Sequence, residues 1–471
     1  MTKVLITTAI DYVNDVIHIG HAYQKIVADT LARCYRITNG RSNVYFLTGT
    51  DENGAKAQEA AKEAGKPIKE FVDSIASADK KEQDSLNISY DRFIRTTDED
   101  HIETVNDFWK KVKETGTDDI YKGDFKGLYC RDCEAFKTSS ELEGARCLIH
   151  PKRRVEAVTE KNYFFHWARY VSFLKEHIKS TPEFVLPPTR RNEVLAFVDK
   201  IEDITISRRK EAVYWGIQVP GDPTQVIYVW FDALINYLTG AKQKGLWDKK
   251  TKIIHILGKD NLRWHALLWP AMLKSAGYQL PSTVYAHGFL TLNGQKISKS
   301  LGNIIRPTEL VTKYGADPIR YYLLRYTSPE DDNDITIKKL ESAYNSDLAN
   351  GLGNLVARIS KLCQLNKVES SSKPTIKLSP EVASNIKNFQ FDEALRYIWE
   401  EIRKLDRYLE ETKPWEKSSA SRTKVWEKLI IGVQQVAFDL QSLLPETAEK
   451  IAKQFTGPKI KFEKPLFPRI K

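Results

Sequence analysis

The sequence has few of the features that mark membrane or secreted proteins. Its 471 residues contain no apolar run that approaches the ~18 residues needed to span a membrane. The N-terminal stretch MTKVLITTAI is too short an apolar segment for a signal peptide, and no small-residue cleavage site follows it. Cysteine is sparse, and its odd count of five argues against a disulfide framework. These absences favour a cytoplasmic protein with no membrane partner.

The bulk composition describes a large globular chain without internal repeats or long low-complexity segments. Its length predicts about two to four domains. The net charge of +10 suits a polyanionic partner. A solvated basic surface explains the same charge, so composition alone leaves both interpretations open.

The N-terminal region alternates between strand-like and helix-like patterns. An apolar, β-branched run at 3–10 precedes a segment with helical spacing at 21–40, and a second strand-like run at 43–54 ends in a polar turn. Strand, helix and strand in this order form a βαβ unit, which predicts a parallel sheet. The pattern returns at 225–240 and 252–261, whereas the segment from about 338 onward is helical.

The stretch VIHIGHAYQ at 16–24 places two of the nine histidines three residues apart, after the first predicted strand. A helix that begins there directs its free N–H groups and the positive end of its dipole toward an anion. Once helical, His18 and His21 share a face, and Gly20 leaves room for a base or a phosphate. Phosphate chemistry, a metal site and helix packing all remain open from this stretch alone.

A second stretch, LNGQKISKSLGN at 292–303, favours phosphate chemistry. It combines Lys296 and Lys299 with the hydroxyls of Ser298 and Ser300. Such a loop is suited to a polyphosphate, because each lysine is a mobile point charge. A solvated basic loop would show the same composition.

Together the two stretches resemble the paired signatures of class I aminoacyl-tRNA synthetases, which bind ATP and stabilise charge as pyrophosphate leaves. The resemblance to methionyl-tRNA synthetases covers nearly the whole chain, through TTAIDYVNDVIHIGHAY, VYFLTGTDENG, GLYCRDCE, YVWFDALINY, LGKDN, HALLWPAML, AHGFLTLNGQKISKSLGN, ADPIRYYLLR and LANGLGNLVARI. It implies catalytic roles for His18, His21, Lys296 and Lys299. It assigns ATP, with its Mg²⁺, to these positions: His18, Gly20, His21, Gly258, Asp260, Lys296, Ser298, Lys299 and Ser300.

The resemblance also implies a methionine site. In the family an aspartate at the end of the second strand meets the substrate ammonium, which corresponds to Asp51. Aromatic residues line the thioether pocket, as sulfur favours aromatic edges. The full expected set is Ala9, Ile10, Tyr12, Asp51, Trp230, Ala233, Leu234, Tyr237 and His287. Departures from some relatives at 11–15 and at Leu234 lie in the pocket wall.

Three cysteines and a histidine have the spacing of a metal site. Cys130-x-x-Cys133 is followed by Cys147-x-x-His150, which supplies three thiolates and one imidazole. A closed tetrahedral set without an open position predicts one structural Zn²⁺. Relatives carry such a knuckle on the inserted module that covers the active site and the tRNA acceptor end.

The C-terminal helices resemble the anticodon-binding bundle of the family. Asn350, Asn354 and Arg358 are four residues apart, which predicts one helix face. Trp415 follows a proline. In the family these positions read the anticodon, by base-edge contacts and by stacking, which fits recognition of single-stranded RNA.

The resemblance implies an α/β fold: a Rossmann-like parallel-sheet catalytic domain, split by a zinc-binding insertion and followed by an α-helical bundle. The expected segments are a first catalytic half (1–117), the insertion (118–215, with its knuckle at about 128–152), a second catalytic half (216–290), the lysine loop with a stem-contact region (291–340) and the bundle (341–471).

The expected reaction joins L-methionine to ATP as methionyl-adenylate, releases pyrophosphate, and transfers methionine to tRNA(Met), the initiator included. Leucyl, isoleucyl and valyl enzymes normally carry an editing domain for which this length leaves no room, and the cysteinyl enzyme places a zinc in its pocket. A tRNA-binding module that has lost catalysis is the rival from another class. The chain ends soon after the bundle, so we expect a monomer without an obligate protein partner.

Overall fold

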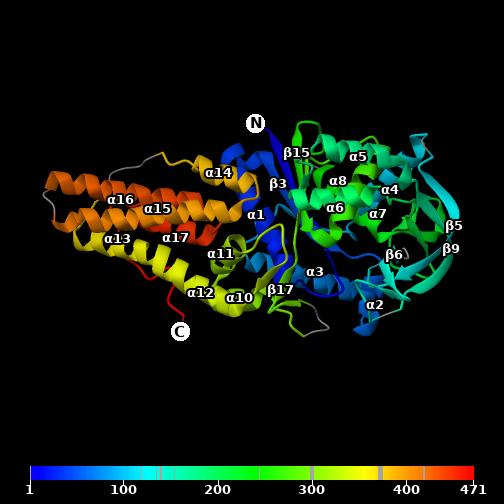
Figure 1. Cartoon of the computed structure of the whole chain (residues 1–471), viewed down its shortest axis with the longest axis horizontal. Helices are drawn as coiled ribbons and strands as arrows, with labels where there is room; N and C mark the ends of the chain where they lie inside the picture. The colour runs from blue at the N-terminus through cyan, green and yellow to red at the C-terminus, as the bar shows by residue number, and fades with distance from the viewer. Residues whose placement is uncertain are drawn as a thin grey trace. The chain divides into compact units, whose positions relative to one another are not determined.

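The computed structural model describes residues 2–116, 118–133, 135–137, 141–152, 154–242, 244–297, 302–369, 375–416 and 419–470. Two compact units are present, and each combines separate stretches of the sequence. The first consists of 1–17, 45–81 and 90–288, and the second consists of 18–44, 82–89 and 289–471. Figure 1 shows most of the strands in the first unit and the long helices α15 and α16 in the second.

A parallel sheet organises the first unit. Its strands lie in the order β10 (Val185–Leu186), β16 (Thr283–His287), β15 (Thr251–Gly258), β1 (Lys3–Thr8), β3 (Val44–Asp51) and β2 (Asp11–Tyr12), and β4 (Arg92–Arg95) also pairs with β3. The pairings of β1 with β15, β15 with β16, and β3 with β4 are parallel. Continuous apolar runs such as that of β1 are typical of strands with both faces covered. The predicted α/β fold is therefore confirmed.

Helices and their aromatic side chains form the core beside this sheet. Phe108 of α4 (Glu99–Glu114) stacks with Trp269 of α9 (Trp269–Ser275) and meets Phe231 of α7 (Val229–Leu234) edge-on. Helices α2 (Ala55–Glu63) and α3 (Ile68–Ser85) follow β3 in the chain, and α8 (Asn236–Lys242) packs against β4 and α4. The carboxyl edge of the strands is where ligands bind in open α/β sheets.

Antiparallel strands occupy the segment between β4 and β15. The long strands β5 (Ile120–Cys130) and β9 (Glu156–Phe165) pair along their length and lie side by side in Figure 1. Strands β6 (Ala135–Lys137) and β11 (Ile204–Thr205) extend that sheet, and β7 (Leu142–Glu143) with β8 (Arg146–Cys147) forms a small hairpin. A third sheet contains β12 (Ser207–Arg209), β13 (Gln218–Val219) and β14 (Asp222–Ile227).

The second unit is mostly helical. It contains α1 (Ile19–Asn39), a small sheet of β17 (Leu290–Leu292), β18 (Gln295–Lys296) and β19 (Asn333–Ile335), and the following helices: α10 (Pro307–Tyr314), α11 (Ala316–Tyr326), α12 (Ile337–Ala343), a π-helix (Tyr344–Gly353), α13 (Asn354–Leu365), α14 (Pro380–Lys387), α15 (Phe391–Thr412), α16 (Ser419–Leu440) and α17 (Pro445–Phe455). This confirms the predicted helical C-terminal region.

A buried arginine joins α1 to the C-terminal helices. Arg320 of α11 is fully buried, forms a 2.8 Å ion pair with Asp29 of α1, and donates to the Leu443 carbonyl oxygen at 2.9 Å. Arg33 also pairs with Asp29, at 2.8 Å. Burial opposes ionisation of Asp29, but the two arginines outweigh it and hold its pKa below the usual value.

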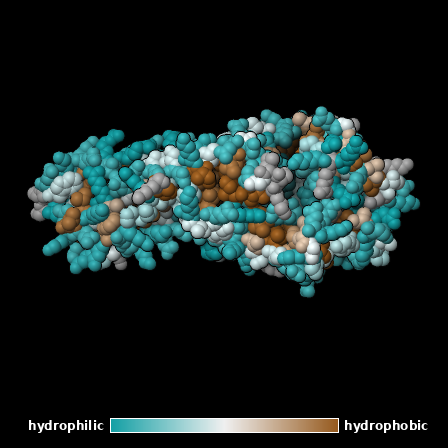
Figure 2. Space-filling model, turned by 90° about the horizontal axis from the view of Figure 1, so that it is seen from below, coloured by the Kyte–Doolittle hydropathy of each residue, from teal (hydrophilic) through white to brown (hydrophobic). Residues whose placement is uncertain are grey.

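One face of the molecule is largely polar. On the face seen in Figure 2, hydrophilic residues predominate and hydrophobic ones show in separate patches. Among the described residues, no helix is long and apolar enough to cross a membrane.

Candidate active site

The end of β3 lies beside the segment that follows β1. Tyr12 of β2 is in register with Asp51, and the Val13 N–H donates to the Asp51 carbonyl oxygen at 3.2 Å. The Ala9 N–H donates to the Ile256 carbonyl oxygen at 2.9 Å, which joins the same segment to β15. The structure thus brings together the predicted positions Ala9, Ile10, Tyr12 and Asp51.

Aromatic rings line the neighbouring space. The Trp230 ring meets Tyr12 edge-on, with centroids 6.2 Å apart, and stacks on Trp264 at 4.6 Å. Lys56 Nζ lies 4.2 Å from the centroid of the Tyr12 ring. Ala233 and Leu234 follow on α7 and are both buried. Two of the predicted aromatic residues, Tyr12 and Trp230, are therefore neighbours, and Trp264 packs against the second of them.

A histidine that the sequence analysis missed lies next to Tyr237. The Tyr237 hydroxyl is 2.6 Å from His265 Nε2, and His265 Nδ1 is 2.9 Å from the Asn261 carbonyl oxygen. Because a carbonyl only accepts, Nδ1 carries the ring proton and Nε2 accepts from the tyrosine. Burial lowers the pKa of His265 to about 4, and burial raises the pKa of Tyr237. Both groups are therefore neutral near pH 7.

His287 is the last residue of β16 and is buried. It is in register with Gly258, and a Cβ built on Gly258 would come within 3.9 Å of its ring and within 2.8 Å of Asp260 Oδ1. His287 Nδ1 lies 2.7 Å from the Gly288 carbonyl oxygen. The structure therefore groups His287 with the predicted ATP residues Gly258 and Asp260, and places His265 beside Tyr237.

The two signature histidines cap α1. His18 Nδ1 accepts from the Gly20 N–H at 3.0 Å, and the His18 N–H donates to His21 Nδ1 at 3.2 Å. This reciprocal arrangement is a capping box built from imidazoles. Since both Nδ1 atoms accept, each neutral ring carries its proton on Nε2. Ile17, just before the cap, donates its N–H to Asp79 Oδ1 at 2.7 Å.

Gly20 has a role in this cap that the sequence did not indicate. A Cβ at Gly20 would meet His18 Cε1 at 2.8 Å and Nδ1 at 3.0 Å. We expected Gly20 to leave space for a base or a phosphate, whereas the space beside its Cα is filled by the His18 ring. The missing side chain lets His18 fold back onto the helix terminus.

Only part of the lysine loop belongs to the described residues. Lys296 lies exposed on β18, and its carbonyl oxygen accepts from Asn303 Nδ2 at 3.0 Å. The predicted positions Ser298, Lys299 and Ser300 lie outside the described residues.

The four predicted metal ligands converge. The ligand atoms of Cys130, Cys133, Cys147 and His150 all lie within 4.8 Å of one another. Cys133 Sγ is 3.6 Å from Cys147 Sγ and 3.1 Å from His150 Nδ1. This arrangement could hold a metal ion, and three sulfurs with one imidazole nitrogen fit a closed tetrahedral site.

The predicted anticodon residues do not lie on one regular α-helix. Asn350 belongs to the π-helix Tyr344–Gly353, whereas Asn354 and Arg358 lie on α13. Asn350 Oδ1 accepts from Arg469 Nε at 3.0 Å. Arg358 Nη1 pairs with Asp406 at 3.1 Å and with Glu410 at 2.9 Å. Asn350 and Asn354 therefore belong to successive helical segments of different type.

Trp415 lies just beyond α15. The left-handed Lys413, with φ of 38°, ends that helix, and Pro414–Glu416 forms a 3₁₀ turn. Trp415 is partly exposed at this turn.

A family model and near full-length relatives match this chain. The model described as "tRNA synthetases class I (M)" matches residues 4–150 and 133–360. The methionine–tRNA ligase of Thermosynechococcus vestitus is 39% identical over 99% of this chain and 92% of its own length. The chain belongs to the class I tRNA synthetases of the methionine type. The methionine–tRNA ligase of Thermotoga maritima is 40% identical over 95% of this chain and 74% of its own length.

Solved structures of this synthetase family agree with the fold. Mycobacterium tuberculosis methionyl-tRNA synthetase bound by methionyl-adenylate has a TM-score of 0.88 and 33% identity, covering 99% of this chain and 100% of that one. Its apo form has a TM-score of 0.81 and 31% identity, covering 100% of this chain and 99% of that one. The chain thus has the family's activity, the ATP-dependent ligation of methionine to tRNA.

Proposed function

We propose that Asp51, Tyr12 and the surrounding aromatic rings form the methionine site. The observation that carries the proposal is the carboxylate of Asp51, which is 4% exposed and ends a strand beside an aromatic wall. A carboxylate there pairs with the α-ammonium of methionine. Trp230 and Tyr237 present the aromatic surface that favours a thioether.

ATP binding is proposed for Gly258, Asp260 and the signature residues. The imidazoles of His18 and His21 would donate to phosphate oxygens, and Lys296 with Lys299 would supply positive charge as pyrophosphate leaves. Mg²⁺ accompanies the nucleotide. No covalent nucleophile is required, because the methionine carboxylate attacks the α-phosphate directly. Positioning and charge stabilisation then account for the rate.

The metal proposed for the cysteine cluster is one structural Zn²⁺. Three thiolates and one imidazole leave no position open for a substrate or a water. The ion would hold the turn after β5 against the β7–β8 hairpin. It takes no part in the chemical step.

The helical unit is proposed to bind tRNA(Met). Asn354 and Arg358 present polar groups on α13, and Trp415 is placed to stack on a base, as in single-stranded RNA recognition. We further propose that the chain acts as a cytoplasmic monomer, with the initiator tRNA among its substrates.

Methionine-dependent exchange of pyrophosphate into ATP tests the site assignment. Asp51→Asn keeps the shape of the side chain and removes its charge, so we expect KM for methionine to rise at least about tenfold, or ~1.4 kcal/mol. KM for ATP serves as the internal control and should not change. An unaltered KM for methionine in Asp51→Asn would show that Asp51 does not bind the ammonium. Exchange with another amino acid but not methionine would refute the substrate assignment.

A further inference from the structure

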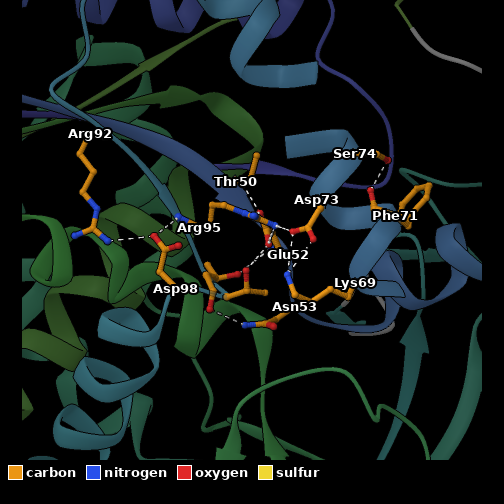
Figure 3. Close-up of polar contacts among 12 residues, drawn as sticks. Thr50, Glu52, Asn53, Lys69, Phe71, Asp73, Ser74, Arg92, Arg95 and Asp98 are labelled. Atoms are coloured by element: carbon orange, nitrogen blue, oxygen red, sulfur yellow. Dashed lines mark hydrogen bonds and ion pairs between the residues drawn. The ribbon is translucent and has the colours of Figure 1, made fainter. Parts of the chain in front are cut away.

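The residue after Asp51 carries a second buried carboxylate. Glu52 is fully buried, and its carboxylate accepts four hydrogen bonds from three residues. Arg95 donates through Nε at 2.6 Å and Nη2 at 2.8 Å, Thr50 donates at 2.8 Å and Thr97 at 2.6 Å. Figure 3 shows the guanidinium of Arg95 facing Glu52. A buried carboxylate is costly without such partners.

The backbone of Glu52 is also held on both sides. Its N–H donates to Thr96 Oγ1 at 2.9 Å, and its carbonyl oxygen accepts from Trp215 Nε1 at 2.7 Å. Asp51 is the last residue of β3, and Glu52 is joined to it by a planar peptide bond, so the backbone contacts of Glu52 limit the direction of the Asp51 side chain. A rotation at Glu52 would therefore turn the Asp51 carboxylate away from the position that the ammonium requires.

A third carboxylate completes the cluster from helix α3. Arg95 Nη2 lies 2.5 Å from Asp73 Oδ1, and Lys69 Nζ lies 2.9 Å from Asp73 Oδ2. The hydrogen bond from Arg95 lowers the pKa of Asp73. Arg95 thus offsets the negative charge of both Glu52 and Asp73.

We propose that Arg95 is a positioning residue for methionine: by holding Glu52, it fixes the direction of the Asp51 carboxylate. The inference rests on the methionine site proposed above. Arg95 acts through Glu52 and does not itself contact the substrate. Its effect is confined to the amino-acid side of the reaction, because its contacts are with Glu52 and Asp73.

The same strand offers a matched control. Arg92 forms a comparable bidentate pair with Asp100, both contacts being 2.8 Å, and a contact of 3.1 Å with Asp98. Arg92 and Arg95 are 18% and 26% exposed. In Figure 3 Arg92 points toward Asp98 and away from Glu52. Replacement of Arg92 therefore changes a similar ion pair that does not include Glu52, and the two arginines are linked through Asp98 Oδ2, which also accepts the Arg95 backbone N–H at 3.1 Å.

The test compares Arg95→Lys with Arg92→Lys in the full-length enzyme, with methionine-dependent ATP–pyrophosphate exchange as the assay. Lysine keeps the charge and loses the two parallel hydrogen bonds. We expect KM for methionine to rise about tenfold in Arg95→Lys, with KM for ATP unchanged, and neither KM to change in Arg92→Lys. Thermal unfolding should shift by a similar amount in both variants. The milder Thr97→Val, which removes one hydrogen bond to Glu52, should raise KM for methionine about two- to threefold and provides the test if Arg95→Lys does not fold.

Two results would overturn the proposal. One is an equal effect of Arg95→Lys and Arg92→Lys on KM for methionine. The other is a parallel rise of KM for both substrates in Arg95→Lys, which would indicate a general loss of structure. Asp51→Asn separates this proposal from the one on which it rests. If Asp51→Asn raises KM for methionine and Arg95→Lys does not, only the role of Arg95 fails; if Asp51→Asn has no effect, the methionine site itself is wrong.

Discussion

The pair of His265 and Tyr237 predicts a specific loss of stability in acid. His265 is 2% exposed, and burial lowers its pKa to about 4, below its unperturbed value of about 6.5. As pH falls through the higher of these values, the unfolded chain binds a proton that the folded chain does not bind. Stability is therefore fully present above about pH 6.5 and is lost progressively as the pH falls toward the folded pKa.

The expected magnitude follows from the separation of the two pKa values. One pKa unit corresponds to about 1.4 kcal/mol, so His265 alone should cost about 2 kcal/mol of unfolding free energy between about pH 7.5 and pH 5. Other groups also titrate in this range. A variant that cannot titrate at this position is therefore needed to isolate the histidine.

His265→Gln provides that comparison, because its amide oxygen can still accept from the Tyr237 hydroxyl. Urea denaturation followed by tryptophan fluorescence gives the unfolding free energy of both proteins at the two pH values. The wild type should lose about 2 kcal/mol more than His265→Gln on acidification. Equal losses would refute the deduction that His265 is buried in its neutral form.

Three further predictions follow from the site. Gly20→Ala should push the His18 ring out of the helix cap, because a Cβ there would lie 2.8 Å from His18 Cε1. The adenylation rate in single-turnover assays should then fall about tenfold. A normal rate would contradict the role of the cap. Removal of zinc by a chelator should release about one metal ion per chain in a colorimetric assay and lower the melting temperature, because structural zinc contributes folding energy. Cys147→Ser should also lower the melting temperature. A protein that contains no metal when purified would refute the site. Arg358→Gln should reduce charging of tRNA(Met) at least about tenfold and leave ATP–pyrophosphate exchange unchanged; an equal effect on both reactions would contradict an anticodon role.

The sequence predicted the parallel sheet because its signals are local. The β-branched run before His18, the helical periodicity after it and the second apolar run lie close together in the chain. Each is recognisable from the period of its hydrophobic residues alone. The metal ligands could also be predicted from local signals. Cys130 and Cys133, and Cys147 and His150, each have the short spacing of a metal-binding pair, and both pairs lie in one short segment of the chain.

The π-helices could not be predicted in the same way. A π-turn has no distinct periodicity in segments as short as Trp264–Leu268 and Tyr344–Gly353. The role of His265 was missed for a different reason: its contact with Tyr237 joins residues 28 apart in the chain, which no local pattern indicates.

By itself, the sequence determined which elements form and which short motifs are candidates for the chemistry, because these depend on residues near each other in the chain. Only the tertiary structure decided the partners of the buried polar groups. Glu52 meets Arg95, and Tyr237 meets His265, across separations of 43 and 28 residues. Such pairings follow from strand register and helix packing, and a buried charge or hydroxyl takes whichever complementary group the fold brings within hydrogen-bonding distance.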